Sequence, residues 1–220
     1  MRVLLAFFIP AVILTAQAQP PAKSLKQVSD TKTVAPASKE GVAIYKTVGS
    51  ASAPITIELY TDYECPACRS FFLYTLPDLT KDFINTGKVR LVHRDFRIQS
   101  HQFTKIATRY ANAAGEIGKF DVVANQLFQT QPEWAQNGNV DGEIAKVLSP
   151  ADMEKVRAMV KNDSHLDDSV VRDEAQAINV DHLQETPTVV IVAKGKRESI
   201  GGGGMPYTIL KQYLNQKLSQ

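Results

Sequence analysis

The sequence predicts an α/β fold in which helices cover both faces of a mixed sheet and a helical block separates the two halves of that sheet. Three observations predict it. Residues 55–60 and 88–96 are apolar, β-branched runs typical of strands, and a helical pattern lies between them. Residues 100–180 have helical character throughout. Residues 186–202 contain two further strand patterns, and a final helical pattern follows them.

The first 18 residues have the pattern of a secretory signal peptide. Arg2 precedes an apolar run at residues 3–14, and the small residues of Ala16–Ala18 predict cleavage after Ala18. The alternative is an uncleaved membrane anchor, but a bilayer span needs about 20 apolar residues and Pro10 interrupts this run. We therefore expect a periplasmic or extracellular protein, in a compartment where disulfides persist.

Residues 19–40 are rich in Pro, Ser, Lys and Ala and poor in large apolar side chains. This composition predicts a flexible tether. Residues 41–220 are then expected to form the folded domain, since the chain is 44% apolar and 22% charged, as is usual for globular proteins. With a net charge of +2 and no basic stripe, the chain is not expected to bind nucleic acid.

The first half of the domain is predicted to run strand, helix, strand. A helical pattern follows Cys65, and Pro77 is expected to kink or break that helix because proline lacks an N–H and clashes with the preceding turn. After the strand at residues 88–96, Ser100 is expected to cap the first helix of the helical block.

The second half contains clearer start and turn signals. Ser149–Pro150 supply a cap and a first-turn proline for a helix within the block. Residues 186–202 are expected to form a strand, a tight turn around Gly195 and an antiparallel partner strand. The last helix is expected at residues 205–218, with Pro206 at its start.

Cys65 and Cys68 are the only cysteines of the chain, and Pro66 and Ala67 separate them. A zinc site is one alternative, but it needs about four ligands and the four histidines show no paired spacing near this motif, so no metal is expected. A structural staple is another, but so small a loop constrains the unfolded chain very little. Redox chemistry fits the spacing and the expected compartment.

A strand that leads into a Cys-X-X-Cys motif places the first sulfur at the start of a helix. There the free N–H groups and the helix dipole stabilise a thiolate. The second cysteine lies one turn further along, within reach of a mixed disulfide on the first. Pro66 suits the first helical position because its missing N–H would have no helical partner there.

Five stretches of residues 41–220 resemble the DsbA-like thiol-disulfide oxidoreductases of the thioredoxin superfamily. They are GSASAPITIELYTDYECPAC, HRDFRIQSHQFTKIATRYANAAGEIGKF, ETPTVVIV, GKRESIGG and the last helix. The resemblance implies a thioredoxin-like mixed sheet with a helical insertion at about residues 100–180, and no cofactor.

The resemblance also implies roles for the residues of the motif. Cys65 would be the exposed nucleophile and Cys68 the buried resolving cysteine. The Thr186–Pro187 bond would be cis and lie beside the disulfide, so that the backbone of Thr186 could pair with an extended substrate. The alternative for this pair is a simple turn at the entry to a strand.

Two positions depart from the pattern of the family. Many members have a histidine or another polar or aromatic residue where this chain has Ala67, so we expect the pKa of Cys65 to be lowered less than in the extreme cases. Relatives often place an acid where this chain has Leu59. Glu58 is one residue earlier, and a shift of one residue on a strand points the side chain to the opposite face. Either a bulge redirects Glu58, or the chain lacks this proton relay.

The expected function is that of an exported, monomeric enzyme that donates disulfides to reduced proteins through Cys65 and Cys68. The resemblance implies that a quinone-linked membrane partner reoxidises it. A reductase or isomerase on the same scaffold is the nearest alternative. A secreted binding module with an inert disulfide is the alternative from a different class.

Overall fold

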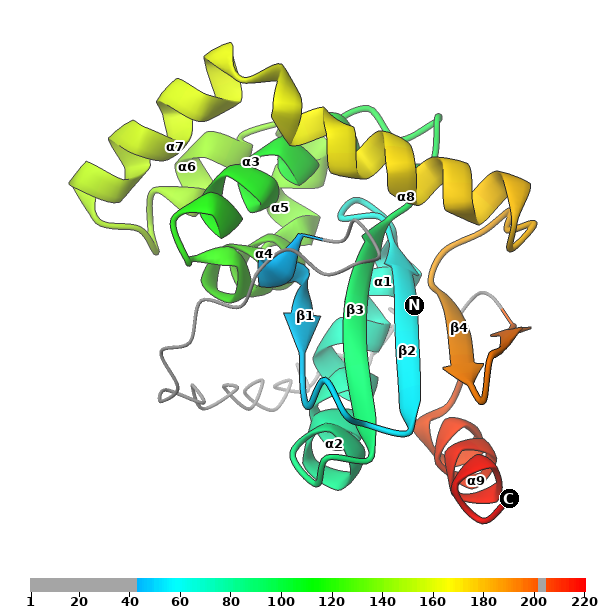
Figure 1. Cartoon of the computed structure of the whole chain (residues 1–220). Coiled ribbons are helices and arrows are strands. Elements are labelled where there is room, and N and C mark those ends of the chain that lie inside the picture. The colour runs from blue at the N-terminus through cyan, green and yellow to red at the C-terminus, as the bar shows by residue number, and fades with distance from the viewer. Residues whose placement is uncertain (1–42, 202–204) are drawn as a thin grey trace, which may run out of the picture.

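The computed structural model describes residues 43–201 and 205–220. The predicted signal peptide at residues 1–18 and the predicted tether at 19–40 lie outside the described residues. In the described part, a mixed sheet lies at the centre with helices on both sides of it (Figure 1). No helix of this part is long and apolar enough to cross a bilayer. The predicted α/β fold with inserted helices is confirmed.

Within the described residues, five strands form one sheet in the order β1-β3-β2-β4-β5. Their bounds are β1 Thr47–Val48, β2 Ile55–Thr61, β3 Val89–Asp95, β4 Thr188–Ala193 and β5 Lys196–Ile200. Strands β2 and β3 are parallel, with Ile55 opposite Val89 and Thr61 opposite Asp95, and the other pairs are antiparallel. The carboxyl ends of β2 and β3 therefore meet at one edge of the sheet.

Helices α1 and α2 follow β2, α3 to α8 lie between β3 and β4, and α9 ends the chain. We call α3 to α8 the helical block. The bounds are α1 Pro66–Ser70, α2 Leu76–Leu79, α3 Thr104–Glu116, α4 Phe120–Gln129, α5 Gln131–Asn137, α6 Val140–Ile144, α7 Pro150–Asn162, α8 Asp168–Asn179 and α9 Tyr207–Leu218. Short 3-10 turns occur at Ile44–Lys46 and Ser164–Asp167.

Alternate side chains of β2 belong to two different cores, because successive residues of a strand point to opposite faces. Ile57 and Leu59 are fully buried in the larger core, with side chains of α1, α2 and α9. Tyr60 belongs to a smaller core with Ala177 of α8 and Val190 of β4. In Figure 1, α1 and α2 lie behind the sheet and α8 crosses its upper end.

The helical block shares the larger core with the sheet. Phe128 of α4 packs against Tyr63 and Phe72, with ring centroids 5.0 and 4.6 Å apart. Each such aromatic pair contributes about 0.5–1.5 kcal/mol beyond simple burial. The block is therefore packed directly onto the segment that carries the two cysteines.

Pro77 does not break the helix that follows Cys65, so of the two expected outcomes, a kink or a break, the break is wrong. The backbone remains helical through a π-helical turn at Phe71–Thr75, α2 and a second π-helical turn at Thr80–Ile84. In the first wide turn, the N–H of Leu76 bonds the carbonyl of Phe71, five residues back. A wider turn just before a proline gives its ring room and tolerates its missing N–H.

The start of α3 also differs from the prediction. The helix begins at Thr104, and no side chain caps the preceding Phe103, so the expected cap at Ser100 is wrong. The N–H of Phe103 instead donates a 2.6 Å hydrogen bond to Oε2 of Glu64, which neighbours Cys65. A carboxylate at this end of α3 also lies favourably in the field of the helix dipole.

Other predicted starts and turns are confirmed. Ser149 caps α7 by accepting a hydrogen bond of 3.1 Å from the N–H of Asp152. Lys194 and Gly195 form the turn between β4 and β5, with φ angles of 49° and 74°. Two successive positive φ angles are typical of the tightest hairpin turns. Pro206 directly precedes α9.

Candidate active site

The turn between β2 and α1 places Cys65 at the start of a helix. Cys65 is the N-cap residue of α1, with φ −74° and ψ 120°, and Pro66 occupies the first turn. The carbonyl of Cys65 accepts a 3.1 Å hydrogen bond from the N–H of Arg69, which closes the first helical turn. The sulfur therefore lies where unpaired helical N–H groups can stabilise a negative charge.

The two cysteines are both free, and they differ in accessibility. Cys68 is completely buried, as the resemblance implies, whereas Cys65 is only 8% exposed. The expectation of an exposed Cys65 is therefore wrong. The loop before β4 covers it, because the carbonyl of Thr186 lies 3.4 Å from the Cys65 sulfur. Pro66 beside it is exposed, so the motif still reaches the surface.

The surroundings move the pKa values of the two thiols in opposite directions. A hydrogen bond from the Cys68 thiol is the largest cause that lowers the pKa of Cys65, to about 5. The Thr186 side chain and then the N–H groups of Cys68 and Ala67 lower it further, against the effect of burial. Burial raises the pKa of Cys68, and the negative charge on Cys65 raises it further. One thiolate and one thiol are thus favoured near neutral pH.

The Thr186–Pro187 peptide bond is cis, as the resemblance implies. The loop that contains it leads directly into β4, and it brings the Thr186 carbonyl to the Cys65 sulfur. The hydroxyl of Thr186 is buried beside the same sulfur, where this side chain helps to lower the pKa of Cys65.

Asp62 anchors the turn below the cysteines. Its buried carboxylate accepts hydrogen bonds of 2.7 Å from the N–H groups of Glu64 and Ile98, and its Oδ2 lies 2.9 Å from Nδ1 of His101. Its own N–H lies 3.5 Å from the sulfur of Cys68. The fold brings His101 here from the segment after β3, and no role in the site was predicted for it from the sequence.

The strand below the motif carries no proton relay. Leu59 is fully buried in the same core as Cys68. Glu58 points to the other face, where it accepts hydrogen bonds from Arg94 at 3.1 Å and Arg197 at 3.0 Å. Burial would raise the pKa of Glu58, but these two arginines outweigh burial and lower it. The absence of a bulge in β2 answers the question that the sequence left open.

Gln131 is a residue of the site that the sequence analysis missed. It begins α5, it is only 4% exposed, and its Nε2 donates to the carbonyls of Tyr63 at 2.7 Å and Cys65 at 2.9 Å. The sequence did contain a signal: Gln131 follows Leu127 by four residues and precedes Trp134 by three, so a polar residue occupies an apolar helical stripe.

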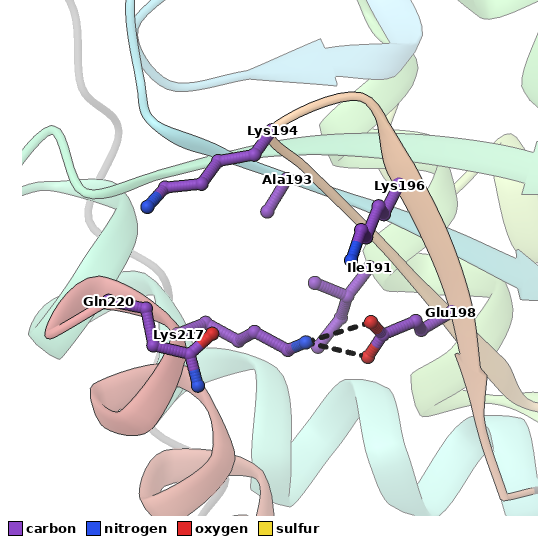
Figure 2. Close-up of a pocket in the computed structure, with 7 residues that line it drawn as sticks. All are labelled: Ile191, Ala193, Lys194, Lys196, Glu198, Lys217 and Gln220. Carbon is purple, nitrogen blue, oxygen red and sulfur yellow. Dashed lines mark hydrogen bonds and ion pairs between the residues drawn. The ribbon is translucent and has the colours of Figure 1, made fainter.

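Two hollows lie at opposite ends of the sheet. A groove of about 600 Å³ borders the turn of Asp62, and its lining includes Ile98, His101 and Gln184. A smaller pocket of about 120 Å³ lies between the β4–β5 hairpin and α9, where Lys217 reaches across to Glu198 (Figure 2). No cysteine lines this smaller pocket. No group of three or more possible metal ligands occurs in the described part of the chain.

Comparisons with known proteins agree with this geometry. A family model described as thioredoxin matches residues 44–200. Disulfide bond formation protein D of Bacillus subtilis (strain 168) is 27% identical over 154 residues, which cover 66% of this chain and 66% of that protein. The chain thus spans about two thirds of the length of this curated relative.

Solved structures show the same fold. Alpha-DsbA1 of Wolbachia pipientis matches with a TM-score of 0.66 and 20% identity, over 79% of this chain and 90% of that one. Oxidised BdbD of Bacillus subtilis matches with a TM-score of 0.67 and 22% identity, over 80% of this chain and 93% of that one. The chain therefore belongs to the thioredoxin superfamily, within its family of DsbA-like thiol-disulfide oxidoreductases.

Proposed function

We propose that this chain donates disulfides to reduced proteins outside the cytosol, with Cys65 as nucleophile and Cys68 as resolving cysteine. The observation that carries the proposal is the position of Cys65 as N-cap of α1, with its pKa lowered to about 5. Thiolate stabilisation favours the reduced pair, and a pair whose reduced form is stabilised is a stronger oxidant.

The chemistry balances as two thiol-disulfide exchanges. A substrate thiolate attacks the Cys65 sulfur of the disulfide, the bond between Cys65 and Cys68 breaks, and Cys68 leaves with the electron pair and takes up a proton. A second substrate thiolate then attacks the substrate sulfur of the mixed disulfide, and Cys65 leaves as a thiolate. The substrate loses two electrons and the cysteine pair gains them.

The raised pKa of Cys68 supports this division of roles. A buried thiol that resists ionisation stays protonated after it leaves, so it does not attack the mixed disulfide as readily as an ionised thiol would. The exposed Pro66 and the cis Thr186–Pro187 loop flank the place where the substrate sulfur must arrive. An extended substrate would pair with the backbone at Thr186, in the manner of an added strand.

The proposed function also involves residues 1–40, which lie outside the described residues, and it requires an external oxidant. Residues 1–18 would direct export and be removed after Ala18, which would leave residues 19–40 as a polar segment ahead of the domain. Each turnover leaves the pair reduced, so an oxidant must restore the disulfide. A quinone-linked membrane partner is the chemical class that we propose for this step.

A redox titration of the Cys65–Cys68 pair in glutathione buffers tests the proposal. The pKa of about 5 lies between those of about 3.5 and about 7 in DsbA and thioredoxin, so we expect a midpoint potential between about −120 and −270 mV. A midpoint at about −270 mV would instead favour a reductase. A pair that fails to equilibrate with glutathione would indicate an inert disulfide.

A trapping experiment separates the two cysteines. The Cys68→Ala variant, mixed with a peptide that contains one disulfide, is expected to accumulate a mixed disulfide on Cys65 that only an added thiol releases. The Cys65→Ala variant is the matched control and is expected to trap nothing, since Cys68 is fully buried. Equal trapping by both variants would contradict the proposed roles.

A further inference from the structure

The amide of Gln131 uses both of its N–H groups on the turn that carries Cys65. Its Nε2 lies 2.7 Å from the carbonyl oxygen of Tyr63 and 2.9 Å from that of Cys65. A primary amide has two donor hydrogens, so these two bonds exhaust its donor capacity. Gln131 is 4% exposed, and water cannot easily replace it as a donor at this position.

The carbonyl of Cys65 belongs to the peptide plane that fixes ψ of this residue, which is 120°. The same oxygen accepts the first helical hydrogen bond, from the N–H of Arg69 at 3.1 Å. Two donors from different directions hold the plane more tightly than the helix alone would. The orientation of this plane decides whether the Cys65 sulfur faces the N–H groups of Ala67 and Cys68, whose hydrogen bonds favour the thiolate.

Four hydrogen bonds, made by three side chains, join the helical block and its first residue's neighbour Phe103 to the segment around the motif. Arg69 donates from Nε to the carbonyl of Phe128 at 2.9 Å, and Glu64 accepts from the N–H of Phe103 at 2.6 Å. Gln131 supplies the other two, and of these three side chains only that of Gln131 bonds a cysteine. The block therefore does more than pack beside the motif, because one of its side chains donates a hydrogen bond to the backbone of the nucleophile.

We infer that Gln131 is a positioning residue of the redox centre, which holds the Cys65 peptide so that the sulfur faces the start of α1. This inference rests on the proposed redox function and adds a contribution of the helical block to it. Without the amide, the Tyr63 carbonyl loses its side-chain donor and the Cys65 plane is held by α1 alone. The sulfur then spends less time in front of the helical N–H groups.

The test compares Gln131→Met with Gln126→Met in the full chain. Methionine keeps the length of the side chain and removes both donors. Gln126 is the matched control because it is also buried in the block and donates to Glu143 at 3.4 Å, away from the cysteines. For each reduced variant, the thiolate absorbance and the rate of alkylation of Cys65 are followed against pH, together with thermal unfolding.

We expect Gln131→Met to shift the titration of Cys65 upward by about 0.5–1 pH unit, as befits the weakening of a hydrogen bond to a charged group. Well below the midpoint, alkylation would then be about threefold to tenfold slower than in the wild type. The reduction potential is expected to become more negative in the same variant. Gln126→Met is expected to leave the titration unchanged, even where it lowers the unfolding temperature as much.

An unchanged Cys65 titration in folded Gln131→Met would overturn the inference. If this variant does not fold, Gln131→Asn provides the same test, because it keeps the amide but shortens its reach by one methylene. A folded Gln131→Asn protein with the wild-type titration would also overturn it. A wild-type protein that does not exchange with glutathione would refute the proposed function. If the wild type does exchange but the Gln131 variants keep its Cys65 titration, only the role of Gln131 is refuted.

Discussion

The redox centre and a buried group of charged side chains lie on opposite faces of the same strand, β2. The charged group, which we call the ion network, comprises Lys46, Glu58, Arg94, Asp95, Asp173, Asp181 and Arg197. Arg94 bonds Glu58 at 3.1 Å and Asp173 at 2.8 Å, and it thereby joins β2 and β3 to α8. In the redox centre, backbone N–H groups and the Cys68 thiol stabilise the Cys65 thiolate, and the Gln131 amide bonds the Cys65 carbonyl.

The two regions solve the problem of buried polarity in different ways. In the ion network, three cations and four carboxylates are held together by opposite charges, so the loss of one group leaves its partners with fewer counter-charges. In the redox centre, one thiolate is held by neutral dipoles, so no full charge is left without a partner when the thiolate takes up a proton. A buried group can therefore change its charge at a low cost in free energy only where its neighbours do not depend on that charge.

Removal of Asp173 should break the ion network and give the largest effect. The Asp173→Ala variant leaves Arg94 and Lys46, which are 8% and 1% exposed, without one of their carboxylates. We expect the free energy of unfolding to fall by about 3 kcal/mol, because Arg94 loses a charge-assisted hydrogen bond and the buried N–H of Asp95 loses its acceptor. Chemical denaturation measures it.

The matched control is Asp152→Ala, which removes a carboxylate 3.8 Å from the exposed Lys155 on α7. We expect this change to cost less than about 1 kcal/mol. Neither variant should move the titration of Cys65. Equal losses of stability in the two variants would contradict the importance assigned to the ion network.

The charge of Cys65 should make the stability of the reduced protein depend on pH. Its pKa is lowered from 9.0 to about 5 in the folded state, so the ionised thiol favours folding. This contribution is complete above pH 9, declines as the pH falls and vanishes below about pH 5. The contribution grows by about 2 kcal/mol from pH 5 to pH 7.

Denaturation of reduced wild type and reduced Cys65→Ala at both pH values measures this contribution. The difference in unfolding free energy between the two proteins should grow from pH 5 to pH 7. The pKa of Cys68 is raised, so this second thiol does not titrate in that window. The same change of stability with pH in the wild type and the variant would show that the thiolate of Cys65 is not stabilised by the fold.

A positive charge placed in the redox centre would sharpen the contrast between the two regions. In Ala67→His, an imidazolium beside Cys65 should lower the pKa of that thiol by about one unit, through attraction to the thiolate. One unit corresponds to about 30 mV, so the disulfide should become more oxidising by about that amount. Glutathione titration of the variant measures the shift.

The matched control for this change is Ala67→Gln, which adds bulk and polarity without charge. We expect its midpoint potential to stay close to that of the wild type. If the glutamine variant shifts as far as the histidine variant, then size rather than charge governs the effect at this position.

Local patterns predicted the elements that position the cysteines. Strand β2, the start of α1 after Cys65 and the β4–β5 turn all follow from neighbouring residues, because alternation, caps and turn residues act over a few positions. Two local predictions, a break at Pro77 and a cap at Ser100, were wrong, and only the first has a local cause. The effect of Pro77 was absorbed by a wider turn, and the cap expected from Ser100 was replaced by Glu64 from another segment.

Contacts between distant segments were beyond local patterns. The sequence places Gln131 on an apolar stripe, but only the packing of α5 on the motif shows that its amide ends on Cys65. The coverage of Cys65 likewise depends on Thr186, which is 121 residues further along the chain. The resemblance to a family predicted that Thr186 lies beside the cysteines, but it assigned no role to Gln131 or His101.

Glu58 connects the two regions, since it lies on β2 beside Leu59, and it should have the smallest effect on the redox chemistry. The Glu58→Gln variant keeps the shape of the side chain but removes the charge that pairs with Arg94 and Arg197, so we expect the free energy of unfolding to fall by about 1.5–3 kcal/mol. Because the pKa of Glu58 is lowered in the fold, its contribution to stability is present above the unfolded value of about 4.5 and disappears as the pH falls through the folded value.

Exchange of the Glu58→Gln variant with glutathione, followed from pH 4 to pH 8, should have the wild-type profile, because Glu58 faces away from Cys68. A changed profile in the variant would mean that this carboxylate does exchange a proton with the buried thiol, in spite of its place in the ion network.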